Sequence, residues 1–494
     1  MESAVNPGTT AAAMTGTRRL GFENLEEEVT LDRVEVRGEI PDWLAGSLVR
    51  VTPALLDVGG KPLRHWFDGL AMLNSFSFDD GKVGYGSRFL QTEAYRQARA
   101  GKLDMFGFAH DPCRSLFKRV TSMFSQPRND NTNVNLTRMG QRYVAMTELP
   151  LPVEFDPRTL ETVGLVEWKD KLGGQVTTAH PHLDRERGEL VNYVAHFGPR
   201  THYRVFGVPQ GSVSRREIAS IPVREPAYMH SFGMSERYVI LVEFPLVVNP
   251  LRLATSGLGK RAFIDNYEWK PERGARFLAI DRASGELRGP FEAEPFFAFH
   301  HVNSFERDGE IVVDLIAYED PSVINVLEVE RLRDPDVRIP HGRPRRYRVP
   351  LDGGEVRTEQ LAEVGMDLPR INYRTRNERE YRYAYGAGLR GPDSDWFDQL
   401  VKVNVDSGEV SEWWEDGCYP GEAVFVPAPH AEAEADGIVL SVVLDSTAER
   451  SFLVALDAGS FEELGRAAAP HHIPFGFHGQ FFSAESSQAN SPVG

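Results

Sequence analysis

Short runs of apolar and β-branched residues, bounded by turn residues, recur along the whole chain, and long amphipathic helical patterns are scarce. The clearest runs are Arg237-Tyr-Val-Ile-Leu-Val-Glu-Phe244, Glu310-Ile-Val-Val-Asp-Leu-Ile-Ala-Tyr318 and Gly437-Ile-Val-Leu-Ser-Val-Val-Leu444. The dipeptides Asp308-Gly309 and Asp436-Gly437 lie next to two of these runs and are typical of hairpin turns. The pattern therefore predicts an all-β protein.

A degenerate unit recurs in which a short apolar strand ends in aspartate, a turn follows, and a second strand begins. Its copies are centred on Asp156, Asp281, Asp406 and Asp457. At each we expect an Asx-type turn that closes a hairpin. Repeated antiparallel units without a parallel-sheet pattern favour a β-propeller, which leaves only short sheet edges exposed. A large β-sandwich is the alternative, because such turns occur in any hairpin.

Composition narrows the class of protein. The 494 residues are too many for one simple core, so either two domains or one large closed architecture is expected. The 55 basic and 72 acidic residues give a net charge of −17, which argues against a nucleic-acid partner. With only two cysteines, Cys113 and Cys418, the chain is neither a disulfide scaffold nor a cysteine-based zinc protein.

The ends of the chain are polar and of low complexity. We expect flexible tails at residues 1–20 and 483–494, and a single catalytic propeller domain over residues 21–482. The N-terminus lacks an apolar signal core, and Arg18-Arg19 makes a poor twin-arginine signal. A cytoplasmic location is expected, and the oligomeric state stays open.

Four histidines stand in frames of small or apolar residues, far apart in the sequence. The frames are Thr177-Thr-Ala-His180-Pro-His182, Ala227-Tyr-Met-His230-Ser-Phe-Gly233, Phe297-Ala-Phe-His300-His301-Val-Asn303 and Phe475-Gly-Phe-His478-Gly-Gln-Phe481. Any one of them alone is more often a hydrogen-bonded core residue. Together they fit separate propeller blades that each direct one imidazole at a common axis. An all-histidine cluster holds a first-row transition metal such as Fe, Zn, Cu or Ni.

These four frames, together with Arg64-His-Trp-Phe-Asp68-Gly69, resemble the carotenoid cleavage oxygenases from about Glu23 to Phe482. The resemblance implies a seven-bladed β-propeller with a helical and loop cap over the axial face that bears the metal. It also implies one non-haem Fe(II) on the axis, with the ligands His180, His230, His300 and His478.

Two of the four histidines have a second histidine nearby, which makes their assignment a choice. The family pattern assigns the metal to His180 and leaves His182 as a neighbour. It likewise favours His300 over His301, because the family keeps the Phe-His pair and Asn303. Adjacent residues of a strand point to opposite faces, so only one of His300 and His301 can be a ligand.

The resemblance further implies three carboxylates that orient the metal-bound imidazoles. Glu148 would support His230, and Glu422 would support His478. Asp367 stands where the family usually has glutamate, so its bond to His300 needs a backbone shift, a water or another partner. Thr147 matches a position where a methyl group crowds the vacant side of the iron. Solvated strand-edge acids are the alternative for any one of the three carboxylates.

The activity that the resemblance implies is cleavage of a carbon–carbon double bond of a carotenoid or apocarotenoid by dioxygen. Alternatives are cleavage of stilbene-type phenylpropanoids, retinoid isomerohydrolase activity without dioxygen, and metal binding without turnover. The stilbene-cleaving relatives use polar groups near the pocket, and here Lys102 and Lys118 match no such motif.

Residues 106–124 have the pattern of a basic amphipathic helix. Apolar Cys113, Leu116, Phe117, Val120, Met123 and Phe124 would form one face, opposite Arg114, Lys118 and Ser122. The segment resembles the membrane-docking segment of the β-carotene oxygenase and retinoid isomerohydrolase branch. It predicts peripheral membrane contact for delivery of a hydrophobic polyene. A helix packed on the propeller rim is the alternative.

Overall fold

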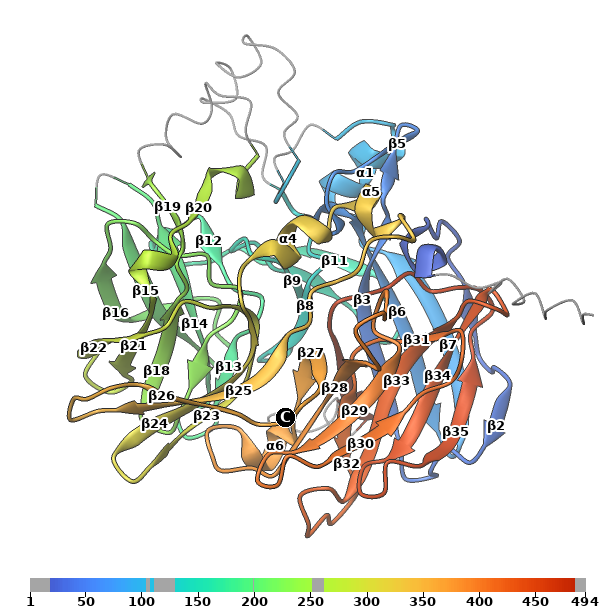
Figure 1. The fold of residues 1–494 in the computed structure, drawn as a ribbon. Coiled ribbons are helices and arrows are strands. Elements are labelled where there is room, and N and C mark those ends of the chain that lie inside the picture. Colours follow the sequence, from blue (N-terminus) through green and yellow to red (C-terminus); the bar gives the residue numbers. More distant parts are fainter. Residues whose placement is uncertain (1–17, 104–106, 111–128, 199, 251–261, 485–494) are drawn as a thin grey trace, which may run out of the picture.

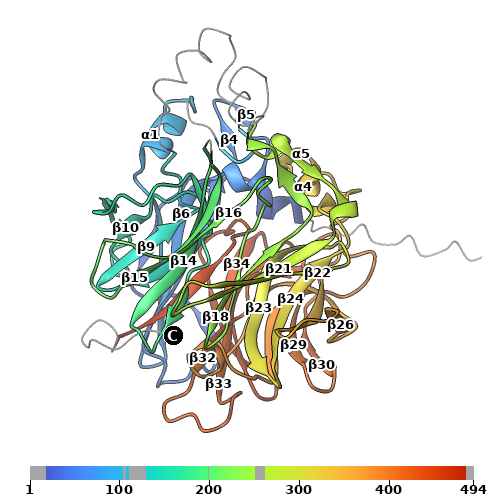
Figure 2. The ribbon, with the colours of Figure 1, turned by 90° about the vertical axis from the view of Figure 1, so that its left-hand side faces the viewer.

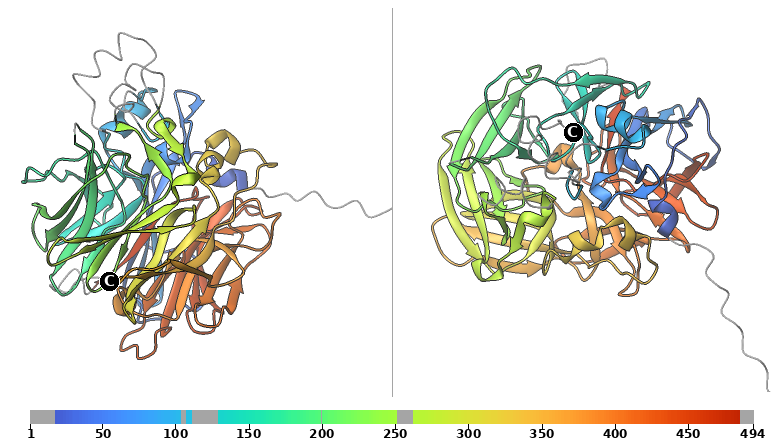
Figure 3. Two further views of the ribbon diagram at one scale, coloured as in Figure 1. Left: turned by 60° about the vertical axis from the view of Figure 1, so that its left-hand side comes forward. Right: turned by 90° about the horizontal axis from the view of Figure 1, so that it is seen from above.

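Seven antiparallel sheets follow one another around a ring, which confirms the β-propeller that the repeated units favoured and the seven blades that the family resemblance implied. The computed structural model describes residues 18–103, 107–110, 129–198, 200–250 and 262–484. Viewed from above, the colours of the chain run once around the ring, until the last strands lie beside the first (Figure 3, right).

Within each blade the strands are ordered from the axis outward. From the inside, blade 1 has β36 (Gly479–Ser483), β3 (Gly46–Leu55), β6 (Leu70–Asp79), β7 (Lys82–Phe89) and β1 (Thr30–Leu31). Blade 2 has β8 (Asn135–Met139), β9 (Arg142–Met146), β10 (Val153–Phe155) and β11 (Thr162–Leu165). Blade 3 has β12 (Val176–Thr177) and β13 (His182–Asp184), then β14 (Glu189–His196), β15 (His202–Pro209) and β16 (Arg216–Pro222). Blade 4 has β17 (Gly233–Met234), β18 (Tyr238–Glu243), β21 (Ala275–Asp281) and β22 (Leu287–Ala293).

The second half of the ring repeats this plan. Blade 5 has β23 (Phe297–Arg307), β24 (Glu310–Tyr318), β25 (Arg343–Pro350) and β26 (Arg357–Gln360). Blade 6 has β27 (Gly365–Arg370), β28 (Tyr383–Leu389), β29 (Gln399–Asn404) and β30 (Val410–Trp413). Blade 7 has β31 (Cys418–Pro420) and β32 (Val424–Pro427), then β33 (Gly437–Asp445), β34 (Arg450–Asp457), β35 (Glu463–Ala468) and β2 (Val36–Gly38).

The three clearest apolar runs of the sequence form β18, β24 and β33, which lie next to the innermost strands of blades 4, 5 and 7. Nearly every residue in them is buried. Both faces of such a strand pack against neighbouring blades, so its apolar residues form a continuous run instead of alternating with polar ones. Burial of both faces therefore explains why these strands were the easiest to predict.

Most of the predicted turns are present, with two corrections. Asp308 and Gly309 both have positive φ and join β23 to β24, as a hairpin turn of this type requires. Gly437 instead begins β33, so the turn predicted at Asp436-Gly437 is wrong. The oxygen Oδ1 of Asp156, Asp281 and Asp457 accepts two backbone N–H groups each, as expected.

At the fourth copy of this turn, the sequence prediction chose the wrong residue. Asn404 accepts the N–H groups of Asp406 and Ser407 through Oδ1. Asp406 lies two residues later, inside the turn that was predicted to depend on it. An asparagine oxygen accepts the same bonds as an aspartate oxygen, so a search for aspartate alone misplaces the unit.

Strands from both ends of the chain close the ring. The C-terminal strand β36 pairs with β3 at the inner edge of blade 1, and the N-terminal strand β2 pairs with β35 at the outer edge of blade 7. The fold also begins earlier than residue 21. The short helix η1 (Arg18–Phe22) is ordered, and Arg18 is buried with its guanidinium donating to the carbonyls of Leu332 and Asp334.

Helices and loops gather on one face of the ring, in agreement with the predicted cap (Figures 1 and 2). They include α1 (Glu93–Arg99), α4 (Ser322–Val326), α5 (Val329–Leu332), η1 and η2 (Trp66–Asp68), together with η3 (Ile264–Asn266), η4 (Pro271–Arg273) and the hairpins β4 (Asp57–Val58)–β5 (Lys61–Pro62) and β19 (Leu246–Val248)–β20 (Tyr267–Trp269). Helix α6 (Tyr373–Arg376) lies toward the opposite face. None of the helices within the described ranges is long and apolar enough to cross a bilayer.

Phe22 fixes η1 to the top of the propeller, and its loss should be costly. Its ring is fully buried and lies 5.0 Å from Trp396, 5.1 Å from Phe475 and 5.8 Å from Trp66 between ring centroids. Phe22→Ala should lower the free energy of unfolding by about 3–5 kcal/mol, measured by urea denaturation. The control Val163→Ala, at a side chain that is 64% exposed, should change it by no more than about 0.5 kcal/mol. Equal effects would show that η1 is not part of the folded unit.

Candidate metal centre

The four histidines predicted as ligands meet on the axis of the ring. Each comes from the innermost part of a different blade: His478 directly precedes β36, His180 lies between β12 and β13, His230 lies shortly before β17, and His300 is in β23. Their nearest ring nitrogens all lie within 4.8 Å of one another. The remaining three blades, 2, 6 and 7, supply the three predicted carboxylates, so each of the seven blades contributes one of these seven residues.

Glu148, which follows β9 of blade 2, binds His230. The Nδ1 of His230 donates to Oε1 of Glu148 over 2.6 Å. The hydroxyl of Tyr228 donates to the same oxygen over 2.7 Å. Burial and the nearby Glu148 raise the pKa of Tyr228 well above its usual value, so the phenol stays protonated and remains a donor. A tyrosine and a histidine thus fix this carboxylate together.

Asp367 on β27 reaches His300 directly, in spite of its short side chain. The Nδ1 of His300 donates to Oδ1 of Asp367 over 2.7 Å. Of the three routes considered from the sequence, a backbone shift fits best, because the register of β27 against β28 is irregular just after Asp367 and Leu368 has a φ of 52°. Burial opposes ionisation of Asp367, but His300 and the hydroxyl of Tyr318 outweigh it and lower the pKa of the carboxyl.

Glu422, between β31 and β32, is the most enclosed of the three acids. The Nδ1 of His478 donates to its Oε1 over 2.6 Å, and the Nε of Arg370 donates to the same oxygen over 2.8 Å. Burial opposes ionisation of Glu422, but the guanidinium of Arg370 and the His478 ring lower its pKa far below the usual range. Buried Arg50 donates to the backbone carbonyl of Glu422 over 3.3 Å. This corner of the site therefore carries a permanent negative charge balanced by arginine.

The spacing of the ring nitrogens fits a metal ion. In His230, His300 and His478 the Nδ1 carries the proton given to a carboxylate, so Nε2 carries a lone pair. The Nε2 atoms of His300 and His478 lie 3.1 Å apart, as do those of His180 and His230. Ligands about 2.1 Å from a metal and at right angles lie about 3.0 Å apart. Two facing lone pairs repel at this distance, whereas a cation between them attracts both.

Burial favours the neutral form of His180, His230 and His478, which is the form that binds a metal. Burial lowers the pKa of His180 well below its usual value, and the other three histidines lower it further. Burial also lowers the pKa of His478 to about 4, against the opposing effect of Glu422. The same cause lowers the pKa of His230. No hydrogen bond joins the His180 ring to any of the three carboxylates within the described ranges.

The two neighbouring histidines lie outside the cluster. His182 has its Nδ1 within 3.1 Å of the Tyr373 hydroxyl and its Nε2 within 3.0 Å of the Phe232 carbonyl. His301 turns to the other side of β23, where Nδ1 lies 2.8 Å from the Ser231 hydroxyl. The structure thus brings His180 and His300, and neither neighbour, to the axis.

The positions of Thr147, Lys102 and Lys118 do not test the roles considered for these residues. Thr147 lines a small, mostly apolar cavity between blades 2 and 3, together with Thr178 and Pro181, which flank His180. Its expected role of crowding the metal stays a prediction. Lys102 is exposed after α1, and Lys118 lies outside the described residues.

Three contributors were missed from the sequence: Tyr228, Tyr318 and Arg370. Tyr228 lies inside the frame of His230, two residues before it, and Arg370 lies three residues after the predicted carboxylate Asp367. Their position could have drawn attention to them. Tyr318 ends an ordinary apolar strand, β24, and nothing in the local sequence marks it.

Aromatic rings from the cap and the inner strands surround the cluster. Phe67 of η2 stacks on His230 with ring centroids 6.1 Å apart, and Phe299 lies 5.3 Å from the same imidazole. Phe477 and Phe108 pack on Phe67 at 5.2 Å and 5.0 Å. The approach to the metal from the cap is therefore walled by apolar rings.

Fold and site define a propeller protein with an all-histidine metal centre on its axis. Residues 22–483 match the family RPE65, described as retinal pigment epithelial membrane protein. The chain belongs to this RPE65/carotenoid oxygenase family, and the resemblance seen in the sequence is confirmed.

Relatives and solved structures agree over nearly the full length. The chain is 36% identical to the mitochondrial carotenoid-cleaving dioxygenase of Macaca fascicularis, over 90% of this chain and 91% of that protein. It is 32% identical to the β,β-carotene 15,15'-dioxygenase of Gallus gallus, over 93% of this chain and 95% of that protein. A variant of the Synechocystis apocarotenoid oxygenase has a similar structure, with a TM-score of 0.84 and 26% identity over 95% of this chain and all of that one.

The ligand assignment predicts which histidines the metal needs. Alanine at His180, His230, His300 or His478 should each abolish retention of the metal, because each removes one converging lone pair. His301→Ala should keep about one metal ion per protein, since its ring is turned away from the axis. Metal content after anaerobic purification, measured by elemental analysis, checks this. Loss of the metal in His301→Ala with retention in His300→Ala would reverse the assignment.

Proposed function

We propose that this protein cleaves a carbon–carbon double bond of a carotenoid or apocarotenoid with dioxygen, using Fe(II) held by His180, His230, His300 and His478. The enzyme class, a carotenoid cleavage dioxygenase, is the one expected from the sequence, and it is confirmed by relatives that carry this activity in their names. The observation that carries the proposal is the set of four ring nitrogens within 4.8 Å, three of them oriented by buried carboxylates.

Iron is the proposed metal because the ligands and the reaction both favour it. Neutral imidazoles suit Fe, Zn, Cu and Ni, and zinc has no redox chemistry. A cobalt-substituted form of the Synechocystis enzyme, with a TM-score of 0.83 and 26% identity to this chain, is known. When bound, ferrous iron supplies the redox chemistry that makes dioxygen reactive toward an alkene.

The reaction balances without a further reductant. One carbon–carbon double bond and the oxygen–oxygen bond break, two carbon–oxygen double bonds form, and each product receives one oxygen atom. The chain's own task is then to orient the imidazoles, hold one double bond of the polyene beside them and keep water out. The buried carboxylates do the first, and the rings of Phe67, Phe299 and Phe477 support the other two.

Isotope incorporation tests the proposal. Incubation under ¹⁸O₂ with a C40 carotenoid, a shortened apocarotenoid and a hydroxylated stilbene should give labelled aldehydes from one of the first two. Rapid reduction to alcohols prevents exchange with water, and mass spectrometry reads each label. His300→Ala serves as the control and should give no product.

The other outcomes separate the alternatives. Cleavage of the stilbene alone would make the protein a phenylpropanoid oxygenase. Conversion of a retinyl ester to retinol without dioxygen would make it an isomerohydrolase. Iron binding without turnover of any substrate would leave a metal-binding propeller. Each of these results would overturn the carotenoid proposal.

We infer from the sequence that residues 106–124 give peripheral contact with a membrane and deliver the polyene. Most of this segment lies outside the described residues. The inference rests on its apolar side, its basic residues Arg114, Lys118 and Arg119, and the lipid solubility of the substrate class. The net charge of −17 makes any attraction to anionic lipid local and sensitive to salt. A cytoplasmic location accords with this inference.

Replacing Leu116, Phe117 and Val120 together by serine should reduce binding to anionic liposomes in a sedimentation assay. Turnover of a long carotenoid presented in lipid should fall, while a detergent-dispersed apocarotenoid should be cleaved at the original rate, because the metal centre is untouched. The matched control replaces exposed Val163 by serine. Equal loss on both substrates with a lowered melting temperature would instead indicate a helix packed on the propeller.

A further inference from the structure

Tyr318 makes an unusual contact for a residue that ends an apolar strand. Its hydroxyl donates to Oδ2 of Asp367 over 2.6 Å, and both side chains are buried. Tyr318 is the last residue of β24 in blade 5, whereas Asp367 is on β27 in blade 6. The bond therefore crosses the boundary between the blade that carries His300 and the blade that carries its carboxylate.

Both carboxylate oxygens of Asp367 accept hydrogen bonds. Oδ1 accepts from His300 over 2.7 Å and from the backbone N–H of Leu368 over 2.8 Å, and Oδ2 accepts from Tyr318. Three donors from two blades determine both the position and the plane of the carboxylate. An aspartate has one methylene fewer than a glutamate, so its side chain cannot extend to follow a displaced His300. Its bond to His300 therefore depends on donors that hold the carboxylate in place.

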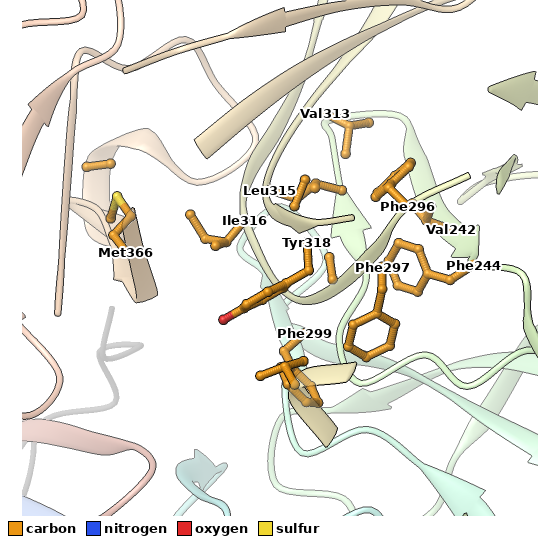
Figure 4. Packing of buried hydrophobic residues seen from close by; sticks show 14 of the residues in the cluster. Val242, Phe244, Phe296, Phe297, Phe299, Val313, Leu315, Ile316, Tyr318 and Met366 are labelled. Carbon is orange, nitrogen blue, oxygen red and sulfur yellow. The ribbon is translucent and has the colours of Figure 1, made fainter. Parts of the chain in front are cut away.

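The ring of Tyr318 is itself held in place. Its centroid lies 6.2 Å from that of Phe299, at an interplanar angle of 78°, and 6.5 Å from that of Phe297. A Cβ at Gly342 would come within 2.8 Å of the ring, so its far side is closely covered by backbone. Figure 4 shows the hydroxyl of Tyr318 directed away from Phe297, toward the side on which Met366 lies. The packing around the ring thus aims the donor at the carboxylate.

We propose that Tyr318 is a positioning residue that enables the short Asp367 carboxylate to orient His300 for metal binding. The proposal rests on the metal centre proposed above and goes beyond it, because the Tyr318 hydroxyl bonds to Asp367 and not to a ring nitrogen of the four histidines. The alternative is a buried tyrosine whose hydroxyl merely finds an acceptor. The two differ in whether the tyrosine is still needed once the carboxylate is longer.

A double-mutant cycle tests this dependence. Co²⁺ binding to metal-free protein is followed by visible absorption for the wild type, Tyr318→Phe, Asp367→Glu and the double variant. Tyr318→Phe should weaken Co²⁺ binding at least about 10-fold, the usual scale for a group that orients a metal ligand. In the Asp367→Glu background the same change should cost less than about 3-fold, because the extra methylene replaces the restraint.

Tyr238→Phe is the matched control. Tyr238 lies in the same apolar cluster, is buried, and its hydroxyl has no hydrogen-bond partner within the described ranges. Its removal should leave Co²⁺ affinity unchanged. If Asp367→Glu fails to fold, Tyr318→Phe against Tyr238→Phe decides the question alone.

The outcomes separate this inference from the proposed function. Equal Co²⁺ affinity in Tyr318→Phe and the wild type would overturn the role of Tyr318 and leave the metal centre intact. An equal loss from Tyr318→Phe in the wild-type and the Asp367→Glu backgrounds would assign Tyr318 a structural role only. Failure of the wild-type protein to bind Co²⁺ would overturn the metal centre, and the inference with it.

Discussion

The structure depends on holding four imidazole lone pairs face to face at a distance where they repel. No local element can do this, because the four histidines come from blades 1, 3, 4 and 5. A closed ring solves the problem, since its inner edges meet on one axis at fixed angles. The three other blades then supply the carboxylates that decide which nitrogen carries the proton in three of the four rings, those of His230, His300 and His478. The same ring of blades therefore places the histidines and also the carboxylates that set their protonation.

The three carboxylates are restrained in different ways that reflect their surroundings. Each carboxylate accepts from a histidine and from one further side chain. That further donor is a tyrosine hydroxyl at Glu148 and at Asp367, whereas at Glu422 it is the guanidinium of Arg370. A neutral phenol adds a bond without adding charge, so it leaves the carboxylate's charge to face the metal. The arginine at Glu422 offsets charge locally. The summed charge around the axis is therefore set by the three acids together with Arg370.

Much of the fold was predictable because its signals are local. A strand buried on both faces gives an unbroken apolar run, as in β18, and an Asx turn needs one oxygen at one position. One error arose because a different residue type can accept the same hydrogen bonds, as Asn404 does in place of Asp406. The other arose because an Asp-Gly dipeptide also occurs outside hairpin turns, as where Gly437 begins β33. The histidines could be grouped because their frames resemble a family. Tyr318 could not be found, since its role exists only where blades 5 and 6 meet.

The manner in which the ring closes also determines when the site can form during synthesis. His478 and β36 belong to blade 1, yet they are made after all other blades, hundreds of residues behind β3. A growing chain on the ribosome carries the other three histidines long before the fourth emerges. The four-histidine centre can therefore be completed only after strands of all seven blades have been synthesised. A chain that stops short of His478 has at most three of the four imidazoles, so it cannot form the complete four-histidine centre.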